Sequence, residues 1–118
     1  DAAPTVAALA ALEVRAGATK LAPDTVVAAL AALPGWSVDD GALRKAYRFP
    51  DWPRTMAFVN AVADMADRVD HHPEFRVGWG RCTVAWWTHD ADGITQNDLA
   101  CAARTEALAG AGTAEPPA

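Results

Sequence analysis

The 118-residue sequence has few of the patterns on which several protein classes depend. Its two cysteines, Cys82 and Cys101, lie far apart without a C-x-x-C pair, which argues against a zinc ribbon or redox motif and favours two buried free thiols. Ser37 is the one serine, and no nucleophile motif surrounds it. The sequence also has no G-x-G-x-x-G or G-x-x-x-x-G-K loop for holding a nucleotide phosphate.

Positive charge is also scarce, with 10 Lys and Arg against 15 Asp and Glu and a net charge of -5. Proteins that bind a phosphate backbone or anionic lipids need a basic face, so we expect no nucleic-acid partner and no membrane association. No apolar run approaches the roughly 20 residues that span a bilayer. Because Asp1 to Pro4 lack the basic start of a secretory signal, we expect a cytoplasmic protein. The high alanine content suggests a bacterial source.

The length is that of one ordinary domain, and 52% of the residues are hydrophobic, which is enough for a single core. We expect this domain to cover residues 21–109. Residues 1–20 are Ala-rich with few large apolar side chains, and we expect an N-terminal arm, helical or disordered, outside the domain. Residues 110–118 consist mostly of Gly, Ala and Pro and are expected to form a disordered tail.

Hydrophobic periodicity predicts three helices and four strands within the domain. The expected helices cover residues 23–33, 53–70 and 96–108, and the expected strands cover residues 36–38, 43–49, 75–79 and 82–88. A stripe of Phe58, Val62, Met65 and Val69 marks the buried side of the long helix. Both strand pairs are close enough in sequence to be hairpins. We therefore predict an α+β fold, a four-stranded antiparallel sheet with three helices packed on one face.

The three histidines are the strongest candidates for chemistry, and each follows a predicted element. His71 and His72 come after the long helix, and His89 comes after the most apolar strand. Imidazole, with an ordinary pKa of about 6.5, both donates and accepts protons near neutral pH. The simpler alternative is that the His71–His72 pair only caps the helix carbonyls. A metal site is a third possibility, but no H-E-x-x-H motif supports it, so we predict none.

One segment carries a family resemblance, which then continues along the chain at fixed spacing. Residues 67–74, Asp-Arg-Val-Asp-His-His-Pro-Glu, resemble the signature of the pterin-4a-carbinolamine dehydratase family. The later matching positions are Trp79, Thr88, His89, Gly93, Ile94, Thr95 and Asp98. The resemblance covers roughly residues 21–108. It departs from the family pattern at Phe75, where many relatives have Trp, and at the bulky pair Trp86–Trp87.

The resemblance implies a dehydratase that converts 4a-hydroxy-tetrahydrobiopterin to quinonoid dihydropterin and water. This reaction recycles the pterin cofactor of aromatic amino-acid hydroxylases, and it needs no metal or other cofactor. The family assigns catalysis to the positions of His71, His72 and His89. We expect His71 and His89 to exchange protons with the substrate and His72 chiefly to bind the ring.

The resemblance also implies substrate-binding roles for Asp67, Asp70, Thr88, Asp98 and Trp79. Several of these positions keep two interpretations. Asp67 either binds the pterin or orients His71. Asp98 either belongs to the site or caps the last helix, and the two roles are compatible. Trp79 either packs or forms a stacking wall for the pterin.

Family members generally assemble as dimers or tetramers, so a homodimer or homotetramer is implied, with an aromatic amino-acid hydroxylase as a partner. Some relatives are instead non-catalytic, acting as transcriptional coactivators or as assembly factors for a carbon-fixing enzyme. A role with another pterin, in molybdenum-cofactor metabolism, is a further alternative. All three histidines are present in this chain, which favours catalysis over a binding role alone.

Overall fold

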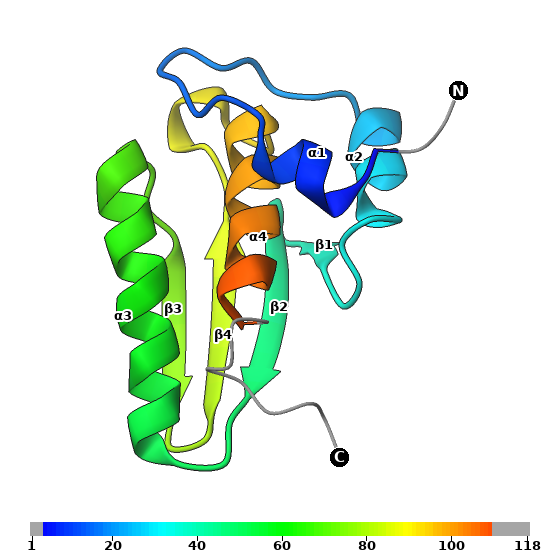
Figure 1. Cartoon of the computed structure of the whole chain (residues 1–118). Coiled ribbons are helices and arrows are strands. Elements are labelled where there is room, and N and C mark those ends of the chain that lie inside the picture. The colour runs from blue at the N-terminus through cyan, green and yellow to red at the C-terminus, as the bar shows by residue number, and fades with distance from the viewer. Residues whose placement is uncertain (1–3, 110–118) are drawn as a thin grey trace.

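A computed structural model describes residues 4–109 of the chain as one antiparallel sheet with helices (Figure 1). The helices and strands are α1 (Val6–Ala10), α2 (Pro23–Leu30), β1 (Ser37–Asp39), β2 (Ala42–Arg48), α3 (Trp52–Val69), β3 (Glu74–Gly78), β4 (Arg81–Trp86), the short 3-10 helix η1 (His89–Ala91) and α4 (Gln96–Leu108). The sheet order is β1-β2-β4-β3, and every pair is antiparallel. The predicted α+β fold is confirmed. The tail expected at residues 110–118 lies outside the described residues.

Two tight hairpins set the register of the sheet. Asp39 pairs with Ala42, so Asp40 and Gly41 form a two-residue turn with φ values of 51° and 76°. Positive φ at both positions is what a type I′ turn requires, and an Asp-Gly pair provides it. The second hairpin joins β3 to β4 through Trp79 and Gly80.

The core lies between the sheet and the two long helices, which stand side by side across one face in Figure 1. Strand β4 contributes Cys82, Val84 and Trp86, none of which has exposed surface. Helix α3 contributes Phe58 and Val62, which are also fully buried. Each large apolar side chain buried in this way contributes about 2 kcal/mol. Met65 and Val69 extend the predicted stripe but are only partly buried.

Capping residues close in the sequence define where helices α3 and α4 begin and where α3 ends. Asp51 caps α3 by accepting a hydrogen bond from the Arg54 amide, and Asp70 ends the helix in the left-handed region at φ 53°. At α4, Thr95 and Asp98 form a capping box, with the Asp98 carboxylate accepting from the Thr95 amide. The C-terminal end of α3 and the N-terminal end of α4 position the side chains of the candidate site.

The segment before α2 packs against the rest of the chain. Leu9 in α1 is 4% exposed and belongs to the core. The Arg104 guanidinium of α4 donates to the carbonyls of Ala10 and Leu12. Within residues 4–109, none of the helices has the length and apolar character to cross a membrane.

Candidate active site

A buried hydrogen bond joins the end of α3 to the start of α4. His71 immediately follows the left-handed residue Asp70, and its amide donates back to the carbonyl of Ala66. This turn directs the ring toward α4, where Nε2 lies 2.6 Å from Oδ1 of Asp98. Asp98 has no exposed surface, and the His71 side chain is 13% exposed. The pair is therefore held in a mostly water-excluded environment in which an ionic hydrogen bond is strong.

The other oxygen of Asp98 accepts two further hydrogen bonds. Its Oδ2 receives the Thr88 hydroxyl and the Thr95 amide, each at 2.8 Å. Thr88 donates its one hydroxyl proton to Asp98. In the 2.8 Å hydrogen bond between the Thr88 and Thr95 hydroxyls, Thr95 must therefore be the donor. A carboxylate that accepts three hydrogen bonds is fixed in position, which in turn fixes the imidazole bonded to it.

The protonation pattern of His71 follows from these partners. An ionised carboxylate only accepts, so Nε2 must carry the proton in the bond to Asp98. The ring also stacks on the buried Trp86 indole, at 5.6 Å between centroids and 18° between planes. Within the described chain Nδ1 has no hydrogen-bond partner. In neutral His71 this nitrogen carries a free lone pair, which makes it suitable as a proton acceptor.

A cavity of about 590 Å³ adjoins His71. Its walls include His71, Asp70 and Thr88 from the predicted site, together with Asn97 and residues 14–20. Its volume falls within the range usual for small-molecule sites. The sequence prediction contained neither Asn97 nor the segment 14–20. These residues reach the cavity through tertiary contacts, which the sequence pattern does not show.

The remaining predicted residues are not among those that line this cavity. His72 and His89 are exposed and are not among its lining residues, although both are chain neighbours of residues that line it. Asp67 is also exposed, and its carbonyl accepts the Asp70 amide. Trp79 is 67% exposed in the β3–β4 turn. The whole of β3 separates it from the histidines, about 17 Å for a five-residue strand.

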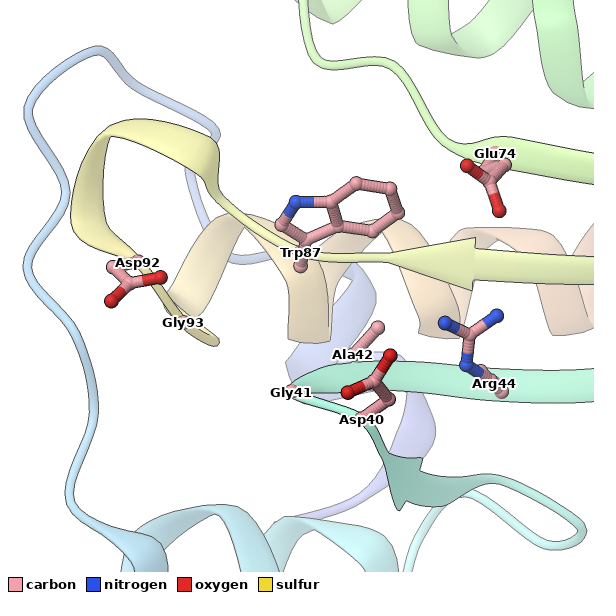
Figure 2. A pocket seen from close by; sticks show the side chains of 8 residues that line it. All are labelled: Asp40, Gly41, Ala42, Arg44, Glu74, Trp87, Asp92 and Gly93. Atoms are coloured by element: carbon pink, nitrogen blue, oxygen red, sulfur yellow. The ribbon is translucent and has the colours of Figure 1, made fainter.

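A second cavity of about 390 Å³ lies beside the segment that leads from β4 to η1 (Figure 2). Figure 2 shows the Trp87 indole between Glu74 and Asp92, with Arg44 and Asp40 across from it. This cavity contains no histidine. The larger cavity with the His71–Asp98 pair is therefore the better candidate for acid–base chemistry. Within residues 4–109, no three His, Cys, Asp or Glu side chains group closely enough to hold a metal ion.

Comparisons with known proteins agree on one family. Residues 19–108 match the family model described as pterin 4 alpha carbinolamine dehydratase. A relative from Chromobacterium violaceum, named "Putative pterin-4-alpha-carbinolamine dehydratase", is 50% identical over 92 residues, covering 78% of this chain and 85% of the relative. A relative from Paracidovorax citrulli with the same name is 48% identical over 92 residues, covering 75% and 79% of the two chains.

Two solved structures share the fold. A transcriptional coactivator/pterin dehydratase from Brucella melitensis has a TM-score of 0.75 and 31% identity, covering 77% of this chain and 99% of its own. A pterin dehydratase-like protein described as a RuBisCO assembly factor in the alpha-carboxysome has a TM-score of 0.53 and 26% identity, covering 64% and 87%. The family match over residues 19–108 and the level of identity place this chain in the pterin-4-alpha-carbinolamine dehydratase family.

Proposed function

We propose that this protein catalyses the dehydration of a 4a-hydroxy-tetrahydropterin to the quinonoid dihydropterin, by histidine acid–base catalysis in the cavity beside His71. The observation that carries the proposal is the 2.6 Å bond from His71 Nε2 to the buried Asp98, which leaves Nδ1 free for a ligand. An imidazole held in one tautomer by a carboxylate is an effective general base.

The reaction breaks one bond to oxygen and one to hydrogen. His71 takes the proton from N5 of the pterin through Nδ1, and the Asp98 carboxylate stabilises the resulting imidazolium. The electron pair left on N5 forms the N5=C4a double bond as the C4a–O bond breaks. A proton delivered to the departing hydroxyl makes it water, so atoms and charge balance without oxidation or reduction. We assign that delivery to His89, which follows Thr88 at the edge of the cavity.

The other predicted residues keep secondary roles in this proposal. His72 binds the ring, and Asp70, which lines the cavity, contacts the pterin or influences His71. Asp98 serves as a positioning residue as well as a helix cap, because it has no surface for substrate contact. Trp79, which is 67% exposed beyond the end of β3, is given no role in pterin stacking. We further propose a cytoplasmic role in recycling the cofactor of an aromatic amino-acid hydroxylase, in a homodimer or homotetramer.

The test is a dehydration assay on purified protein with a freshly formed 4a-hydroxy-tetrahydropterin. We expect acceleration over the uncatalysed reaction, unchanged activity in EDTA, and a loss of about 100-fold or more in kcat for His71→Ala and for His89→Ala. A pull-down from lysate in parallel examines binding partners. A wild-type protein without activity would contradict catalysis, and full activity in both variants would contradict the proton-transfer roles of His71 and His89. The first result would favour a non-catalytic binding or assembly role.

A further inference from the structure

Residues 13–21 form a strap that connects α1 to α2 across the N-terminal end of α4. Both ends of the strap are attached to this region. The Gln96 side chain donates to the Glu13 carbonyl at 2.7 Å, and the Leu21 amide donates to the Ile94 carbonyl at 2.8 Å. In Figure 1 the strap is the blue segment that arches over the top of the molecule, beside the yellow loop after β4. It is therefore fixed to the part of the chain that carries Asp98.

Asn97 holds the strap at Arg15 through both the oxygen and the nitrogen of its side-chain amide. Its Oδ1 accepts from the Arg15 amide at 3.0 Å, and its Nδ2 donates to the Arg15 carbonyl at 2.7 Å. Asn97 is only 5% exposed. Since Thr95 and Asp98 already cap α4, the Asn97 side chain is not needed for the helix end. Its two hydrogen bonds to the amide and the carbonyl of Arg15 resemble those between two paired peptide units, and they fix the position of the strap.

The strap forms a wall of the cavity that contains His71. Each residue from 14 to 20 lines this cavity, together with His71 and Thr88. At the far end of this wall Lys20 lies against Gly93, where an added Cβ would be 2.7 Å from the Lys20 Cε. A ligand that fills the space beside the His71 ring therefore contacts the strap.

Two cations on this wall are available to a ligand. Arg15 and Lys20 line the cavity, and within residues 4–109 neither forms an ion pair with a carboxylate. Their charged ends are suitable donors for oxygen-bearing substituents on a bound ring. The family model begins at residue 19, so five of the seven wall residues, 14–18, precede the matched region.

We propose that the strap is the substrate-binding wall of this pocket and determines the affinity for the pterin, with Asn97 as the positioning residue. The inference rests on the proposed function, because the pterin is taken as the ligand. It assigns binding to a part of the chain that lies largely outside the family match. Proton transfer stays with the histidines, so the strap affects KM and Kd rather than kcat.

The first test is Asn97→Ala, with Asn60→Ala on the exposed side of α3 as the matched control. Losing both bonds to Arg15 frees the strap, and we expect KM and the product Kd to rise about tenfold, while kcat stays within about twofold. The control should leave all three unchanged. Product binding is measured by titration of the protein with the dihydropterin, independently of turnover.

A second variant keeps the inference testable if Asn97→Ala fails to fold. Ala16 is exposed and lines the cavity, so Ala16→Trp adds bulk to the wall without entering the core. We expect the same rise in KM and Kd. If wild-type protein binds and dehydrates the pterin but KM and Kd are unchanged in the folded variants, the strap inference is wrong and the proposed function stands. If wild-type protein neither binds nor dehydrates it, the proposed function itself fails, and the strap inference with it.

Discussion

The Nε2 atom of His71 lies 2.6 Å from Oδ1 of Asp98, and the two residues come from the ends of different helices. Asp98 is fully buried, and its other oxygen accepts from the Thr88 hydroxyl and the Thr95 amide. One carboxylate thus serves as a helix cap and as an orienting group for an imidazole. This double role explains why either interpretation of Asp98 from the sequence was reasonable.

Replacing Asp98 with Asn tests this orientation directly. The Asn side chain has nearly the same shape, and its oxygen is needed where Oδ2 accepts from the Thr88 hydroxyl and the Thr95 amide. Its NH2 group therefore faces Nε2 of His71 and cannot accept a hydrogen bond from it. The imidazole is driven toward the wrong tautomer or a new position. We expect kcat to fall by about 100-fold or more, as for carboxylates that orient a catalytic histidine. The measurement is steady-state dehydration with its pH profile.

Asp90→Asn serves as the control for Asp98→Asn. Asp90 also lines the cavity but is exposed, and none of its contacts orients His71. It should retain kcat within about threefold. Equal losses in the two variants would indicate a general electrostatic effect of cavity carboxylates rather than orientation of one ring.

Thr88 is the next link in the chain of hydrogen bonds. Thr88→Val keeps the shape but removes the donor to Asp98 and the acceptor for the Thr95 hydroxyl. Removing these two hydrogen bonds from buried groups should lower the free energy of unfolding by about 1–3 kcal/mol, and kcat should fall with it. Urea denaturation and turnover are the two measurements. Thr83→Val, in strand β4, is the control, and an equal response in both variants would argue against a special role for Thr88.

How far the sequence predicts this protein depends on how local each signal is. The hairpin of the first two strands and the cap at Asp98 could be predicted because each involves residues close in sequence, and both occur in the structure. The strap could not be predicted, because its main contact joins Asn97 to Arg15, which lie 82 residues apart in the sequence. The position of Trp79 is a third case. Trp79 matches a position of the family pattern in the sequence, but the β3–β4 hairpin places it away from the histidines.

Glu106 holds together a second polar cluster, none of whose members lines the cavity beside His71. Its Oε1 accepts from Trp36 Nε1 at 3.0 Å, from Lys45 Nζ at 2.6 Å and from the Tyr47 hydroxyl. Glu106→Ala should therefore destabilise the fold by about 2 kcal/mol or more, which lowers Tm by several degrees, with kcat unchanged.

Asp64→Ala provides the contrast for Glu106→Ala. Asp64 pairs with Arg68 on the surface of α3, where both side chains are more than half exposed. An exposed ion pair of this kind contributes little to stability, so Tm should stay near that of the wild type. Thermal unfolding of both variants at neutral pH makes the comparison. A similar Tm loss in each would show that burial of the Glu106 cluster adds nothing.

Because two cysteines are buried, the free energy of unfolding should depend on pH in the alkaline range. Burial raises the pKa of Cys82 from 9.0 to about 11 and that of Cys101 to about 12, and burial with the Glu106 contact raises the pKa of Tyr47 as well. Above about pH 9 the unfolded chain loses these thiol protons while the folded chain keeps them. The free energy of unfolding should therefore fall as pH rises from about 9 toward 12, and it should be insensitive to these thiols below that range.

Cys101→Ala separates the thiol contribution from that of other groups. Removing the thiol removes one group that titrates in the unfolded chain before the folded one, so the variant should lose less stability than wild type between about pH 8 and pH 11. Its stability at about pH 8 will be lower, because the smaller side chain leaves space in the core. The informative quantity is the difference between the two pH values, measured by urea denaturation with a reductant present. Identical pH slopes for variant and wild type would mean that the Cys101 thiol is not the group that titrates.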